Sequence, residues 1–177
     1  MTDKVEIKQI DKEEDTITKF KNLYSEVNSL FNVHACDFSC INGEAMNYRA
    51  KFFSLMSKAD AAKREFGNIK CVNYDDISIE VKRLYKKMKF IYYMSDIIYQ
   101  YIMNDFIRPD INHSSKMTHV CTIMCYLKMI MKDGFDITEE DKLNMYLVQI
   151  QGILSLYIKN SIVVDEIRNT LVNIITE

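Results

Sequence analysis

The sequence predicts an all-α protein. Only four glycines and one proline occur in 177 residues, and strands with their turns use both residues more often than helices do. Apolar residues recur at three- and four-residue steps along most of the chain, which is the period of an amphipathic helix. We therefore expect a bundle of six to seven helices around one central apolar helix.

Residues 15–177 are expected to form a single domain, because a chain of this length can bury its own core and no linker divides it. Residues 1–14 are charged and are predicted to be a polar extension without the apolar core of a signal peptide. No stretch is long and apolar enough for a membrane anchor. Five cysteines without a secretion signal indicate a reducing compartment, the cytoplasm or also the nucleus.

The first two helices are expected at residues 15–31 and 43–66. Apolar side chains recur on one face of each, and in the second helix this stripe begins at Phe52. Gly67 follows and suits the left-handed position that ends many helices.

The third helical segment spans residues 75–106, which is long for one helix. We expect it to be divided near Lys89 or Ser95. Pro109 is expected to end it, since proline disfavours helix at the preceding residue. Three tyrosines lie beside its apolar stripe: Tyr92, Tyr93 and Tyr99.

The fourth helix is expected to begin at Ser114 or Ser115, whose hydroxyl suits an N-cap. Residues 120–131 are apolar around most of the helix circumference. A helix of this kind is surrounded by others, so we expect it to be the central helix. Buried thiols are expected on it at Cys121 and Cys125.

The last two helices are expected at residues 138–160 and 161–175. Acidic residues at 139–141 suit the start of the fifth, because they complement the helix dipole. This helix carries a second apolar stripe beside the first, formed by Tyr146, Ile153 and Tyr157.

No motif indicates an enzyme, so we expect a non-enzymatic protein without a cofactor. The phosphate-binding glycine motifs are absent. His34, Cys36 and Cys40 are zinc-ligand types, but no fourth ligand accompanies them and we expect ordinary side chains of a loop. His113 and His119 have no nucleophile nearby and are expected to be capping or partly buried. A net charge of −2 argues against a nucleic-acid partner.

One stretch carries a family resemblance. "FFSLMSKADAAKREFGNI" (52–69) resembles the second-helix signature of the poxvirus Bcl-2-like family, whose members are vaccinia-type intracellular antagonists of innate immunity. The chain departs from the family at Ala59, where an acidic residue is usual, and in having no tryptophan. The matching residues are Phe52, Leu55, Met56, Asp60, Ala62, Phe66 and Gly67.

The resemblance implies a Bcl-2-like fold and a host-response antagonist in the cytoplasm of an infected cell. Some family members hold a pro-apoptotic helix in a surface groove. Others bind signalling adaptors or kinases and block NF-κB or interferon-regulatory-factor activation, often as homodimers.

Two absences favour the signalling group. Groove binders often carry Asn-Trp-Gly-Arg at the start of the central helix, where the arginine pairs with an aspartate of the ligand. Here residues 111–120 offer only Lys116, and lysine is the poorer bidentate partner. A membrane anchor is also not predicted. Two alternatives stay open: an apoptosis inhibitor, and a small helical structural or assembly factor.

Partner-binding residues are expected among the tyrosines and methionines, which are enriched at protein interfaces. The second stripe of the fifth helix is a candidate homodimer face, with an ordinary core contact as the alternative. The candidate groove residues are Tyr85, Met88, Tyr92, Tyr93, Tyr99 and Lys116.

Overall fold

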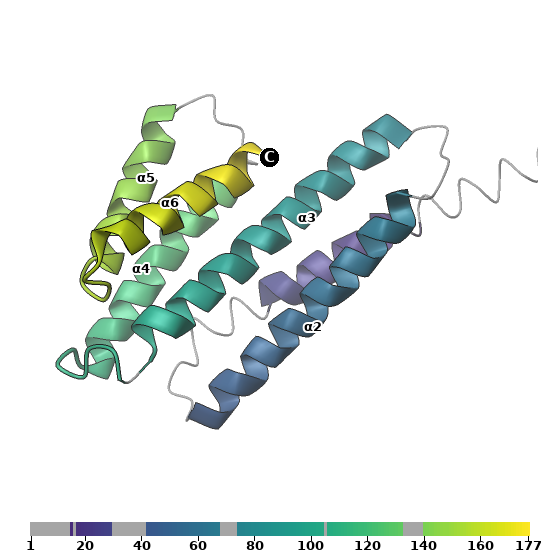
Figure 1. Ribbon diagram of the computed structural model, residues 1–177. Helices are drawn as coiled ribbons and strands as arrows, with labels where there is room; N and C mark the ends of the chain where they lie inside the picture. Colours follow the sequence, from purple (N-terminus) through teal and green to yellow (C-terminus); the bar gives the residue numbers. More distant parts are fainter. Residues whose placement is uncertain (1–14, 16, 30–41, 68–73, 105, 133–139) are drawn as a thin grey trace, which may run out of the picture.

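The computed structural model describes residues 15, 17–29, 42–67, 74–104, 106–132 and 140–177 (Figure 1). All regular structure in these residues is helical, which confirms the all-α prediction. The predicted extension at residues 1–14 lies outside the described part. A helix at residues 17–29 precedes α2 (Asn42–Gly67), α3 (Tyr74–Ile97), the π-helical turn η1 (Ile98–Ile102), α4 (His113–Lys132), α5 (Glu140–Leu154) and α6 (Ser161–Thr176).

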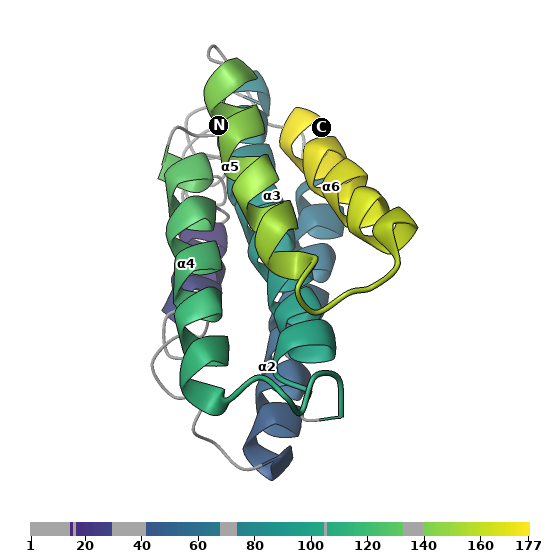
Figure 2. The same ribbon diagram turned by 90° about the vertical axis from the view of Figure 1, so that its left-hand side faces the viewer.

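The helices pack around α3. α2 runs along one side of α3, and α4, α5 and α6 lie on the other side (Figures 1 and 2). The helix at 17–29 is joined to this arrangement by two exposed ion pairs, Lys19 with Glu65 of α2 at 3.3 Å and Lys21 with Glu80 of α3 at 3.4 Å. It also contributes three buried side chains to the core: Phe20, Leu23 and Val27.

The central helix is α3 and not α4, so that prediction was wrong. α3 and η1 bury side chains around most of their circumference, because other helices cover them on both sides. α4 buries one face only. Its other face exposes Cys121, Cys125 and Met129 to solvent, which also corrects the expectation that both thiols are in the core.

α3 is one continuous helix through both expected points of division, Lys89 and Ser95. It ends in the π turn, where Met103 N–H donates to Ile98 C=O at 2.9 Å. This end lies well before Pro109, so the proline does not terminate the helix. Asn104 instead turns the chain, since its Oδ1 accepts the backbone N–H of Phe106 at 3.1 Å.

Asparagine side chains cap the starts of α4 and α6. Asn112 Oδ1 accepts the N–H of Ser115 at 2.8 Å at the start of α4, so neither predicted serine is the cap. Asn160 caps α6 in the same way. Gly67 is the last helical residue of α2 and is not in a left-handed conformation, which corrects its predicted role. α5 ends at Leu154, earlier than expected.

Arg108 ties the η1–α4 connection to the end of α5. Its φ of 115° lies in the left-handed region that side chains rarely adopt. Its guanidinium donates to both oxygens of Asp110 at 2.8 and 2.7 Å, and also to the carbonyl of Leu156. These bonds hold a strained connection in place.

Because of the Arg108–Asp110 pair, we expect the stability of the fold to depend on pH. The hydrogen bonds from Arg108 lower the pKa of Asp110 from 3.8 to about 2. A carboxyl with a depressed folded-state pKa stabilises the fold above its unfolded value and loses that contribution as pH falls toward about 2. We expect wild type to unfold at higher urea than Asp110→Asn at neutral pH, with the gap closing at acid pH. The control is Glu26→Gln, which removes an exposed carboxylate away from the first turn of the helix at 17–29. A gap constant with pH would contradict the expectation.

Candidate functional site

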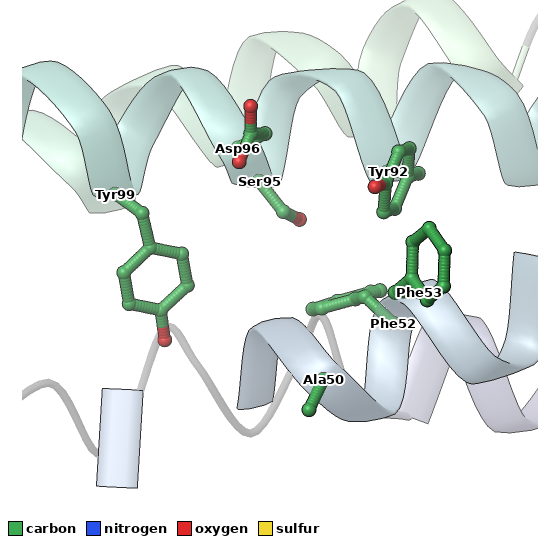
Figure 3. Close-up of a pocket in the computed structure, with 7 residues that line it drawn as sticks. All are labelled: Ala50, Phe52, Phe53, Tyr92, Ser95, Asp96 and Tyr99. Carbon is green, nitrogen blue, oxygen red and sulfur yellow. The ribbon is translucent and has the colours of Figure 1, made fainter. Parts of the chain in front are cut away.

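A pocket of about 270 Å³ lies between α2 and α3 (Figure 3). Both helices supply its lining from their middle or C-terminal turns, and the π turn supplies one tyrosine. The lining is mostly apolar and aromatic, and its polar groups are the hydroxyls of Tyr92, Ser95 and Tyr99 and the carboxylate of Asp96. Its residues are Ala50, Phe52, Phe53, Tyr92, Ser95, Asp96 and Tyr99.

Aromatic rings form the walls of this α2–α3 pocket. Phe52 is buried, and its ring centroid lies 6.5 Å from that of Tyr92 at an angle of 59°. Phe53 is 64% exposed, so the rim carries a large apolar side chain in contact with solvent. Tyr99 stands at the opposite end of the pocket (Figure 3). Such walls suit an apolar or aromatic group.

Ser95 is the unusual residue of the pocket. It is only 5% exposed, and its Oγ has no hydrogen-bond partner among the described residues. Figure 3 shows the hydroxyl pointing from α3 into the space between Tyr99 and the Phe52–Tyr92 pair. A buried hydroxyl without a partner is unfavourable by roughly 1–3 kcal/mol, so few native groups are left this way.

We expect Ser95→Ala to raise the free energy of unfolding by about 1 kcal/mol, because it removes this buried hydroxyl. Ser57→Ala on the exposed side of α2 is the matched control, since it shares the gain in helix propensity. Urea unfolding gives the change in the free energy of unfolding for each variant. The difference between the two changes is the effect of removing the buried hydroxyl. A destabilising Ser95→Ala would mean that the hydroxyl has a stabilising partner in the folded protein.

The signature stretch holds α2 against α3. Its Asp60 accepts a hydrogen bond from the Tyr85 hydroxyl, while Lys63 Nζ lies 4.1 Å from the centre of the Tyr85 ring. Burial and the bond to Asp60 raise the pKa of Tyr85 to about 12. Met56, Ala59 and Ala62 are buried. The side chain of Phe66 lies outside the described part.

The structure divides the predicted groove residues. Tyr92 and Tyr99 line the pocket, whereas Tyr85 is engaged with Asp60 at a different point along α2. Tyr93 is half-buried and turned toward α6, where burial raises its pKa and the hydroxyl of Thr170 hydrogen-bonds to it. Met88 and Lys116 were predicted as groove residues, but both are buried, with exposed fractions of 0% and 5%. Their prediction is therefore corrected.

The predicted dimer-face residues lie close to α4. Tyr146 is half-buried with its ring 5.8 Å from that of Tyr126 on α4. Tyr157, which follows α5, is 3% exposed, and its hydroxyl lies 2.5 Å from His119 Nδ1 in a hydrogen bond. Tyr157 therefore fits the alternative of an ordinary core contact, and its prediction as a dimer-face residue is corrected. Ile153 is half-buried and packs on the core. His119 is partly buried, as expected.

Phe53, Ser95 and Asp96 line the pocket but were not predicted from the sequence as site residues. Ser95 and Asp96 lie three and four residues after Tyr92 on one helical face, which is the signal that joins them to a tyrosine already singled out. The helical spacing places Phe52 in the apolar stripe and its neighbour Phe53 outside it, but no feature of the sequence indicates that Phe53 lines a pocket.

The described part of the chain contains no group of three His, Cys, Asp or Glu side chains that could hold a metal ion. His34, Cys36 and Cys40 lie outside it. Within the same described residues, no helix combines the length and apolarity needed to cross a bilayer.

Among the described residues, the α2–α3 pocket and its buried hydroxyl are features that could take part in binding. Comparison with known proteins adds no relative: no protein-family model matches the chain, and neither a curated protein nor a solved structure matches it.

Proposed function

We propose that this chain is a viral, non-enzymatic antagonist that binds host signalling proteins in the cytoplasm and suppresses NF-κB or interferon-regulatory-factor activation. The family resemblance supplies the biological setting. The α2–α3 pocket is the observation that supports a binding site for such a partner. Its aromatic walls and its exposed apolar rim residue suit the docking of a protein side chain. Part of the signature stretch, Phe52 and Phe53, forms one wall.

The charges near the pocket favour signalling partners over pro-apoptotic helices. In family members that bind such helices, an arginine pairs with an aspartate of the ligand. Here the charged side chain of the lining is an acid, Asp96, and Lys116 is almost fully buried on α4. An acidic ligand helix would therefore gain no ion pair from the described lining of this pocket.

A reporter assay in transfected host cells tests the proposal. Cells carrying NF-κB and interferon-regulatory-factor reporters are transfected with wild type, Phe53→Glu or Phe106→Glu. Both phenylalanines are exposed, at 64% and 92%, so neither change should unfold the protein. We expect suppression by wild type and Phe106→Glu, and its loss with Phe53→Glu. If wild type leaves both reporters unaffected, the proposal is wrong.

Calorimetric titration with a panel of pro-apoptotic helix peptides tests the alternative. We expect no binding at tens of micromolar, because the described residues that line the pocket include no cation for the ligand aspartate. Sub-micromolar binding of any peptide would make apoptosis inhibition the better assignment.

A further inference from the structure

We propose that the outer face of α5 binds the same face of a second copy of this chain, with Gly152 at the point where the two helices cross. This dimer does not depend on the proposed function, because the contact involves two copies of the chain and leaves the α2–α3 pocket aside. It also differs from the homodimer face predicted from the sequence, whose residues pack against α4 or the core: Tyr146, Ile153 and Tyr157.

The outer face of α5 exposes a row of aliphatic side chains. Met145 and Val148 are 51% and 52% exposed, and Leu156, in the turn that continues the helix, is 45% exposed. α5 lies between α4 and α6, and no described helix covers its outer side (Figure 2). Single exposed apolar side chains are ordinary on a protein surface, whereas a row of them on one helix indicates a contact surface.

The same segment carries no charge. Residues 143–158 contain no Asp, Glu, Lys, Arg or His, and their exposed polar side chains are Asn144, Gln149 and Ser155. The cores of protein interfaces are depleted in charged residues. In a contact between two identical faces, a charge near the symmetry axis would meet a like charge. A face without charge avoids this repulsion, which favours a second copy as the partner.

Gly152 has no role within the described chain that requires a glycine. It lies in the last turn of α5 in an ordinary helical conformation, and a Cβ at this position would meet no described atom within 4 Å. Glycine destabilises a helix relative to alanine, so its presence here is unfavourable for the single chain. A glycine does allow the backbone of another helix to approach closely.

The residues around Gly152 are arranged symmetrically. Val148 lies four residues before it and Leu156 four residues after it, so one ridge of α5 carries an aliphatic residue on each side of the glycine. A two-fold axis at Gly152 places glycine against glycine, and each aliphatic residue then meets an aliphatic residue whether the helices run parallel or antiparallel. Leu156 is held in place beforehand, because its carbonyl accepts from Arg108 and its N–H donates to Ile153 C=O at 3.0 Å.

Analytical ultracentrifugation of the full chain tests for this dimer. We expect a monomer–dimer equilibrium at roughly 10–500 μM, because one helix face gives a contact at the small end of the range of protein interfaces. Two-dimensional NMR of labelled protein during dilution locates the contact. The resonances that shift with concentration should be those of residues 145–156.

Gly152→Ala separates association from folding. A methyl group at the crossing point should weaken dimerisation by at least about tenfold, because it keeps the two backbones apart. Urea unfolding of the dilute monomer should show equal or higher stability, since alanine is the better helix former and its Cβ meets no described atom. If the glycine served only the fold of the single chain, the variant would be less stable and would dimerise normally.

Val148→Glu should weaken dimerisation by at least about a hundredfold, because it brings two like charges toward the axis. Ile79→Glu is the matched control. Ile79 is 67% exposed near the start of α3 and lies outside the α5 face, so this change should leave the equilibrium unaltered.

Three results would overturn the inference. The first is a wild-type chain that stays monomeric at about 500 μM. The second is dimerisation of Gly152→Ala or Val148→Glu with the affinity of wild type. The third is a set of dilution shifts that lie on helices other than α5, which would place the dimer contact on a different face.

Discussion

Phe90→Ala is expected to lower the free energy of unfolding by about 3–5 kcal/mol, the range for removing a buried phenylalanine from a core. Phe90 is 0% exposed on α3, the helix that other helices cover on both sides. The loss combines the transfer free energy of the ring with the cavity that its neighbours fill only partly. Small domains have total stabilities of roughly 5–15 kcal/mol, so this one change removes a large share.

The same substitution at Phe106 is the control. Phe106 is 92% exposed in the connection between η1 and α4, so Phe106→Ala should change stability by no more than about 0.5 kcal/mol. Urea unfolding followed by far-UV circular dichroism measures both. Equal effects of the two truncations would show that α3 does not occupy the centre of the bundle.

Ala62→Leu is the second large effect, expected at about 1–3 kcal/mol of destabilisation. Ala62 is 2% exposed on the face of α2 that packs into the core, so a larger side chain must displace its neighbours. Alanine and leucine have similar helix propensities, which leaves overpacking as the dominant cause. The effect would explain why the signature stretch has a small residue at this position.

Ala61→Leu is the matched comparison, one residue away on the same helix. Ala61 is half-buried and should accept leucine with a change of about 0.5 kcal/mol or less. Thermal and urea unfolding of the two variants give the difference. If Ala62→Leu is tolerated as well as Ala61→Leu, the small residue is not required for packing.

The helical composition, the apolar faces and the approximate helix positions followed from the sequence. Few glycines and one proline favoured helices, and the three- and four-residue spacing identified buried side chains such as Phe20, Phe52 and Leu147. This information is local, because the side chains that share a face are fixed by the helical repeat within one segment. Tyr92 and Tyr99 of the pocket were predicted for another reason, because tyrosines are enriched at protein interfaces.

Helix ends were predicted less well, because several residues in a row could cap each start. Asn112 and Ser115 are both good caps in isolation, and the direction of the η1–α4 connection decides between them. The connection is itself fixed by Arg108, which reaches the carbonyl of Leu156 far along the chain. A contact between such distant residues leaves no periodic signal in the sequence.

The sequence by itself determined that this protein is helical and which face of each helix is apolar. Only the tertiary structure decided that α3 is central and that α4 exposes Cys121 and Cys125, because an apolar face does not specify which helix covers it. The pocket depends on the same kind of information. Ser95 became a candidate binding group when α2 packed beside α3 and buried its hydroxyl without supplying a partner from the described residues.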